Sequence, residues 1–103
     1  MMKKIIYISG PYTKGDTALN VRNAIDAADI LLEKGYIPFV PHLSHFWHFI
    51  SPKTHAEWME IDRAILERCD ALLRLGGESA GADEEVEYAR QLGIDIYWSI
   101  KDL

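Results

Sequence analysis

The sequence contains a single cysteine, Cys69, and no apolar run that approaches the length of a membrane span. One cysteine cannot form an internal disulfide, so nothing indicates an oxidising compartment. A membrane-spanning helix needs about 20 consecutive apolar residues. The N-terminus enters a strand-like run at once and shows no signal-peptide pattern. We therefore expect a cytoplasmic protein that does not bind membranes.

Basic clusters are also missing. Eleven Lys and Arg residues face 16 Asp and Glu residues, the net charge is −5, and the longest basic run is Lys3-Lys4. Proteins that bind nucleic-acid polymers neutralise phosphates with clustered cations, so no such polymer is expected as a partner. The sequence also lacks a Walker A motif and a G-x-G-x-x-G fingerprint. ATPase and NAD-dependent roles thus have no support, and no cofactor is expected.

Short apolar runs alternate with amphipathic segments along the 103 residues, 49% of which are hydrophobic. The expected strands are residues 3–9, 36–40, 71–75 and 94–98, and the expected helices are about 17–34, 55–69 and 80–92. Strands that alternate with helices form βαβ units with parallel strands. We expect one domain, residues 1–103, with a three-layer Rossmann-like α/β fold. Its parallel sheet would have four to five strands and helices on both faces.

The loops at one edge of this sheet are the expected functional region. Ligands of such folds bind at the carboxyl ends of the strands, which are followed here by residues 9–13, 41–48 and 76–81. Pro38 and Pro41 indicate that the second strand is short or lies at the sheet edge. Asp16 or Thr17 can cap the first helix, and Gly35 stands where a C-terminal capping glycine belongs.

The stretch from His42 to Thr54 has no clear period and is rich in histidine and aromatic residues. His42, His45 and His48 are spaced by three residues, but no Cys-x-x-Cys accompanies them, so we expect no metal site. Interleaved aromatic residues favour a lid over a bound ligand, with His45 and Trp47 as contact residues.

Each expected helix has an apolar face. These faces comprise Ala18, Val21, Ile25, Ala28 and Leu32 in the first helix, Trp58, Ile61, Ile65 and Cys69 in the second, and Ala82, Val86, Ala89 and Gly93 in the third.

Two carboxylates fall on the apolar side of their helices. Glu85 lies at the edge of the third stripe, between Ala89 and Leu92, and Asp62 lies within the second. An ionised carboxylate that faces a core is costly unless it is paired, hydrogen-bonded or opened to a site. Each acid by itself could serve as a structural cap or ion-pair partner. Two inward acids on neighbouring helices, one of them after a glycine-rich turn, favour a site.

Residues 77–81 match G-x-S-x-G, the nucleophile-elbow pattern of α/β-hydrolases. That fold places its catalytic histidine after the serine, whereas His55, the last histidine here, precedes Ser79, and the chain is too short for the fold. A serine hydrolase is therefore excluded. The free N–H groups and the helix dipole at residues 79–82 instead suit an anion such as phosphate or carboxylate. Ser79 could also serve only as a helix N-cap.

Taken together, the chain resembles the nucleoside 2-deoxyribosyltransferase-like family, which includes nucleoside 5′-monophosphate N-glycosidases. The resemblance runs from Tyr7 to Gly93. It rests on Tyr7-Ile8-Ser9-Gly10-Pro11, on Asp62 and Asp70, and on Ser79-x-Gly81-x-x-x-Glu85-x-x-x-Ala89. It implies an enzyme that cleaves or transfers an N-glycosidic bond of a small nucleoside or nucleotide.

The resemblance also implies roles for individual residues. Glu85 would be the nucleophile that attacks C1′ of the sugar, and Tyr7 would hold its carboxylate in line. Asp62 would contact the departing base or the sugar and assist protonation.

The resemblance further assigns substrate contacts. Ser9, Gly10 and Pro11 would belong to the binding loop, and Ser79 and Gly81 would line the phosphate or 5′ end. The nucleoside-using transferases usually carry aspartate where Ser79 stands, and the monophosphate hydrolases carry serine, which favours a nucleotide substrate. Lys14 partly substitutes for an arginine of those hydrolases.

Two other functions stay open, a nucleotide-binding or sensing module with the same pocket and a purely structural or interaction domain. A homodimer or larger homo-oligomer is expected, because large aromatic and apolar residues exceed what a four-stranded sheet can cover. The candidates for this surplus are Trp47, Phe49, Trp58, Met59 and Trp98.

Overall fold

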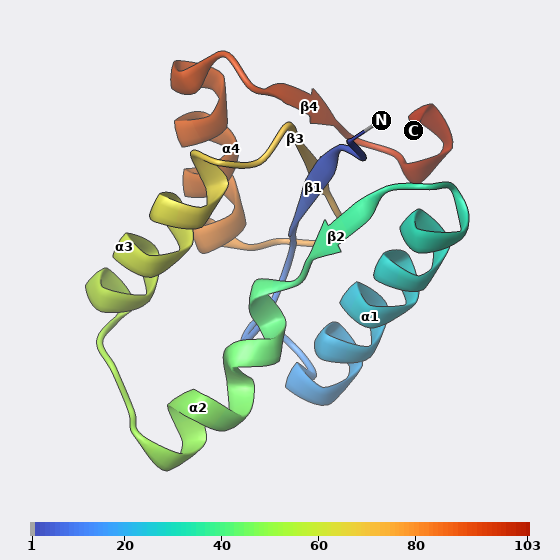
Figure 1. Ribbon diagram of the computed structural model, residues 1–103. Coiled ribbons are helices and arrows are strands. Elements are labelled where there is room, and N and C mark those ends of the chain that lie inside the picture. Colours follow the sequence, from blue (N-terminus) through green and yellow to red (C-terminus); the bar gives the residue numbers. More distant parts are fainter. Residues whose placement is uncertain (1) are drawn as a thin grey trace.

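The computed structural model describes residues 2–103 (Figure 1). The strands are β1 (Ile5–Ser9), β2 (Ile37–Phe39), β3 (Ala71–Arg74) and β4 (Asp95–Tyr97). The α-helices are α1 (Thr17–Glu33), α2 (His45–Ile50), α3 (His55–Leu66) and α4 (Ala80–Leu92), with 3₁₀ turns η1 (Pro41–Ser44) and η2 (Ile100–Asp102). Every helix in this described part is too short or too polar to cross a lipid bilayer.

The four strands form one parallel sheet in the order β2-β1-β3-β4. Strand β2 lies at an edge, as Pro38 indicates, because proline has no N–H to donate to a neighbouring strand. Helix α1 covers one face of the sheet, and α3 and α4 cover the other (Figure 1). The three-layer α/β fold expected from the sequence is confirmed.

Two hydrophobic cores fill the spaces between the layers, because successive strand residues point to opposite faces. On the α1 side, Ile6 and Ile8 pack with Ala71 and Leu73. On the side of α3 and α4, Tyr7 and Leu72 form the second core together with residues of both helices. Tyr7 is fully buried there, which places its hydroxyl beneath α4.

Local signals set the helix ends. The Asp16 side chain accepts a hydrogen bond from the Leu19 N–H and caps α1, as expected. Gly93 ends α4 with φ of 75°, a left-handed conformation that glycine adopts without steric cost. A capping box between Thr54 and Glu57 starts α3.

The expected apolar face of α1 is wrong. Of its five residues only Ala28 is buried, and the buried face consists of Ala24, Ala27, Ala28 and Leu31. Small residues face the sheet because the helix packs closely on it. Ile25 and Leu32 lie at the margin of this face and are 39% and 53% exposed.

The buried face of α3 is centred on other residues than the expected apolar face. Met59 and Leu66 are its buried residues, whereas Trp58, Ile61 and Ile65 are half-buried. The segment after β2 differs from its irregular prediction too, since η1 and α2 occupy residues 41–50.

Candidate active site

A cavity of about 700 Å³ opens beyond the carboxyl ends of the strands. Its wall comes from the loops after β1, β2 and β3, from the segment that joins α2 to α3, and from one face each of α3 and α4. All three loops expected from the sequence therefore contribute to it. The volume is in the range of small-molecule sites.

The carboxylate of Glu85 lies at the floor of this cavity and is only 6% exposed. The Tyr7 hydroxyl donates a hydrogen bond to its Oε2, and the Ser9 hydroxyl donates to its Oε1 at 2.9 Å. Burial raises the pKa of Glu85 to about 7, although the hydrogen bonds from Tyr7 and Ser9 favour the ionised form. Glu85 is thus a cavity-lining residue whose carboxylate two hydroxyl groups hold in a fixed orientation.

Tyr7 is held as a hydrogen-bond donor. Burial raises the pKa of its phenol far above the ordinary value, and the neighbouring negative charge of Glu85 raises it further. The hydroxyl therefore stays protonated at any physiological pH. It can orient Glu85 but cannot act as a base.

Asp62, on α3, is half-buried and lines the same cavity. Burial raises its pKa to about 6, and its charge in turn raises the pKa of Glu85. Two carboxyl groups with raised pKa values in one cavity can divide the work of base and acid near neutral pH.

Ser79 caps α4, because its hydroxyl accepts a hydrogen bond from the Ala82 N–H at 3.1 Å. It also lines the cavity, together with Ala80 and Gly81. The first N–H groups of a helix have no partner within the helix, so those of Ala80 and Gly81 are available to an anion. Lys14 lies at the same end of the cavity, 3.8 Å from the carboxylate of Glu78.

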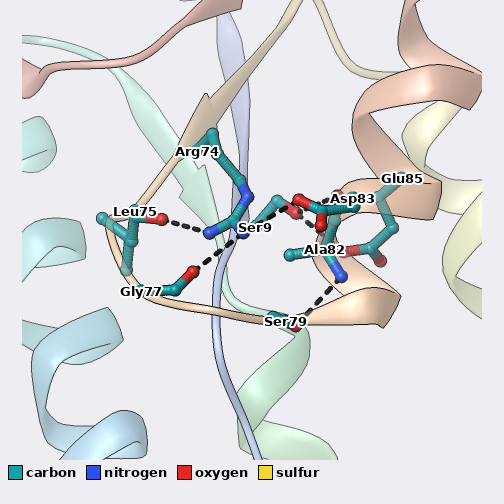
Figure 2. Close-up of polar contacts among 8 residues, drawn as sticks. All are labelled: Ser9, Arg74, Leu75, Gly77, Ser79, Ala82, Asp83 and Glu85. Atoms are coloured by element: carbon teal, nitrogen blue, oxygen red, sulfur yellow. Dashed lines mark hydrogen bonds and ion pairs between the residues drawn. The ribbon is translucent and has the colours of Figure 1, made fainter.

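Arg74 organises the loop that leads to this helix end (Figure 2). Its guanidinium donates to the carbonyl oxygens of Leu75 and Gly77 and pairs with Asp83 at 3.0 Å. Its positive charge also lowers the pKa of Glu85. Sequence reasoning missed this residue. The signal was a cation at the end of an otherwise apolar strand, and its importance depends on the loop that folds back over it.

The turn at Gly77 lies directly against the Pro11 ring. It has φ of 109°, and a Cβ atom built on it would lie 2.8 Å from the Cγ of Pro11. The loops after β1 and β3 therefore touch at this point. Pro11 braces the Gly77 turn and lies outside the cavity wall, unlike its neighbour Gly10.

His45 and Trp47, which we expected to contact a ligand as part of a lid, lie outside the cavity wall. The His45 ring is hydrogen-bonded to the Tyr12 hydroxyl, and Trp47 stacks edge-on against Trp58 with ring centroids 5.0 Å apart. Both residues therefore contact residues of the cavity wall, His45 contacting Tyr12 and Trp47 contacting Trp58.

Sequence reasoning did not select several residues that line the cavity. These are Tyr12, Thr13, Ser44, Lys53, Met59, three histidines (His42, His48 and His55) and Trp58. His42 is buried and its Nε2 is 3.0 Å from the Pro11 carbonyl. Burial lowers the pKa of His42, so its ring favours the neutral form. Across residues 2–103, no three His, Cys, Asp or Glu side chains are grouped to hold a metal ion.

The fold and this cavity define an α/β protein with a buried carboxylate in a residue that lines a cavity. The chain has the fold of a 2-deoxyribosyltransferase from Bacillus psychrosaccharolyticus (TM-score 0.67, 18% identity over 89% of this chain and 69% of that one). A 2-deoxyribosyltransferase from Leishmania mexicana is similar too (TM-score 0.66, 20% identity). That comparison covers 90% of this chain but only 61% of the Leishmania chain.

By sequence, the chain belongs to the family described as a domain of unknown function, DUF7768, whose model matches residues 4–99. No curated protein matches the chain.

Proposed function

We propose that this domain cleaves or transfers the N-glycosidic bond of a (deoxy)nucleoside 5′-monophosphate, with Glu85 as the nucleophile. The observation that carries the proposal is the Glu85 carboxylate, held by Tyr7 and Ser9 at the floor of a cavity of nucleotide size. The similarity in fold to two 2-deoxyribosyltransferases supports the same chemistry. No metal or cofactor takes part in the proposed reaction.

In the first step, a carboxylate oxygen of Glu85 attacks C1′ of the sugar. The C1′–N bond breaks, its electron pair passes to the base, and a glycosyl ester forms on Glu85. Asp62 lines the same cavity, and its pKa of about 6, above the ordinary value, leaves roughly one tenth of it protonated at pH 7. We assign this proton to the departing base nitrogen.

In the second step, the ester is opened at C1′. Water attacks in the hydrolase reaction and a nitrogen of a second base attacks in the transferase reaction, and Asp62 accepts the proton that the attacking group loses. Glu85 leaves as a carboxylate, and the hydrogen bonds from Tyr7 and Ser9 stabilise its returning charge.

The test is incubation of the protein with a panel of 2′-deoxynucleoside 5′-monophosphates, with released base measured by chromatography. A second base added in excess distinguishes transfer from hydrolysis. Release of base that depends on Glu85 supports the proposal. Binding of nucleotides without release of base, seen as a rise in melting temperature, would instead support the nucleotide-sensing module.

The phosphate preference is tested at Ser79. Aspartate is as good an N-cap as serine, so Ser79→Asp retains the cap on Ala82 and adds a negative charge to the cavity wall. We expect kcat/KM for monophosphates to fall at least about tenfold while kcat/KM for nucleosides changes little. Ser79→Asn, a neutral cap of the same shape, is the control. Equal losses on both substrates in Ser79→Asp would mean that Ser79 is only a cap.

The assembly proposal rests on exposed apolar side chains that gather on η1 and α2. Leu43, Phe46, Phe49 and Ile50 are each at least 60% exposed. Patches of this kind on globular proteins mark contact surfaces. The set of apolar residues expected to remain uncovered is corrected in part. Met59 is buried and Trp58 is half-buried, and both line the cavity. Trp47, Phe49 and Trp98 are exposed.

We therefore propose a homodimer or larger homo-oligomer that uses this α2 surface. Light scattering at micromolar concentration should give a mass at least twice the 11.8 kDa of one chain. Phe49→Asp should lower this mass, whereas Leu19→Asp, on the exposed side of α1, should leave it unchanged. A wild-type mass near that of one chain contradicts the proposal.

A further inference from the structure

His48 has a fixed hydrogen-bonding arrangement at the cavity wall. Its Nδ1 accepts the indole N–H of Trp58 at 2.8 Å and the backbone N–H of Lys53 at 3.2 Å. Both partners are donors and neither can accept. Nδ1 therefore carries the lone pair, and the proton of the neutral ring is on Nε2.

The Nε2–H group of His48 is available to a ligand. Within residues 2–103 it has no hydrogen-bond partner, and His48 is one of the residues that line the cavity. An N–H donor with a fixed direction recognises an acceptor such as an oxo group and disfavours an amino group, whose own hydrogens would face it.

The position of Trp58 places this donor near the part of the substrate that Asp62 protonates. Trp58 and Asp62 are four residues apart on α3, so they lie next to each other on one face of the helix. Both line the cavity, and Met59 adds apolar surface beside them. A flat base that receives a proton from Asp62 therefore lies within reach of the Trp58 ring and of His48.

We propose that His48 is a specificity-determining residue that donates its Nε2–H to an oxo group of the base, and that Trp58 is a positioning residue that, together with the Lys53 N–H, fixes the tautomer of His48. The inference deepens the proposed function and rests on it for the placement of the base. It makes the protein selective for oxo bases over amino bases.

The chain offers a matched pair of tryptophans for the test. Trp47 and Trp58 pack edge-on against each other, but only the Trp58 indole donates to His48. Trp58→Phe removes that donor and retains an aromatic wall, whereas Trp47→Phe removes an indole N–H that makes no hydrogen bond in residues 2–103. His48→Phe removes the donor to the ligand itself.

The first measurement is the ¹⁵N spectrum of the histidine rings, which distinguishes the two tautomers without any ligand. We expect His48 of the wild type and of Trp47→Phe to carry its proton on Nε2. Trp58→Phe should gain a fraction of the Nδ1–H form, because within residues 2–103 only the longer hydrogen bond from the Lys53 N–H then remains to hold Nδ1 as an acceptor. A wild-type His48 with its proton on Nδ1 overturns the inference.

The second measurement is calorimetric binding of two nucleotide pairs, dIMP with dAMP and dUMP with dCMP, in a Glu85→Gln background that prevents turnover. We expect the oxo member of at least one pair to bind about tenfold more tightly. That preference should fall below about threefold in Trp58→Phe and His48→Phe and persist in Trp47→Phe.

The two proposals can fail separately. No preference for the oxo members, no binding of any of the four nucleotides, or an equal preference in all variants overturns the role of His48. Selective binding that depends on His48, in a wild-type protein that releases no base, supports His48 and contradicts the glycosidic reaction. Release of base with unchanged selectivity in Trp58→Phe and His48→Phe retains the reaction and removes the role of His48.

Discussion

Glu85→Gln is expected to reduce the release of base from a deoxynucleoside 5′-monophosphate by about a thousandfold or more. An amide has the shape of the carboxylate but is not a nucleophile, so the glycosyl ester on residue 85 cannot form. The exposed Glu87 on the same helix provides the control, and Glu87→Gln should retain full turnover. Near-wild-type turnover of Glu85→Gln would remove Glu85 from the mechanism.

The same substitution is expected to stabilise the protein, and the gain should depend on pH. The pKa of Glu85 is raised by burial from an ordinary value of 4.5 to about 7. Between pH 4.5 and pH 7 the Glu85 carboxyl of the folded protein binds a proton that the unfolded chain does not. The contribution of Glu85 to the unfolding free energy therefore falls as pH rises, and its full destabilising effect is present above about pH 7. The raised pKa corresponds to a cost of order 3 kcal/mol at pH 8.

Glutamine carries no such charge, so Glu85→Gln should exceed the wild type in unfolding free energy at pH 8 and lose most of this advantage at pH 4.5. Urea unfolding at the two pH values measures the difference. The unfolding free energy of Glu85→Gln could instead be lower than that of the wild type at pH 8 while the two are equal at pH 4.5. That result contradicts the view that residue 85 carries a costly buried charge.

Asp62→Asn is expected to lower kcat/KM about a hundredfold to ten-thousandfold, the usual contribution of a positioned general acid. The loss should be smaller for a substrate whose base leaves without protonation, because Asp62 acts on the leaving group. Glu60→Gln, an exposed acid on the same helix, is the control. Equal losses for good and poor leaving groups would assign Asp62 to binding and not to proton transfer.

The pH profile gives an independent test of the same pair. The pKa values of about 6 for Asp62 and about 7 for Glu85 belong to two carboxyls that interact, and the active form holds one proton, on Asp62, with Glu85 ionised. Because Glu85 has the higher pKa, this is the minor of the two singly protonated forms, and it rises and falls with pH in the same way as the major one. Wild-type kcat/KM should therefore rise near pH 6, fall near pH 7 and peak between them. In Asp62→Asn only ionisation of Glu85 is needed, so the falling limb should disappear. A falling limb that persists in Asp62→Asn contradicts the assignment.

Sequence alone predicted the four strands, the helices α1, α3 and α4, and the α/β fold, but not α2. The predicted features are encoded by local patterns: apolar runs, caps such as Asp16 and glycines such as Gly93 act within one or two helical turns. The same locality revealed Glu85, because helical periodicity places it between Ala89 and Leu92 at the edge of the apolar stripe, and Glu85 is indeed buried. Periodicity located Asp62 on the inner side of α3 for the same reason.

The apolar face of α1 shows where local pattern failed. Its large residues at the margin gave as strong a periodic signal as the alanines that the sheet selects by close packing. Helical periodicity states which residues share a face, but the shape of the opposite surface decides which face is buried.

Tertiary structure alone determined how the site is assembled. Tyr7 and Glu85 are 78 residues apart, and they meet because β1 and β3 pair in register beneath α4. Arg74 acquires its role only when the next loop folds back over its guanidinium. The tautomer of His48 is set by the Trp58 indole on another helix and by the backbone N–H of Lys53. Such contacts depend on strand order, register and loop path, which are properties of the whole packed chain and leave no periodic signal in any one segment.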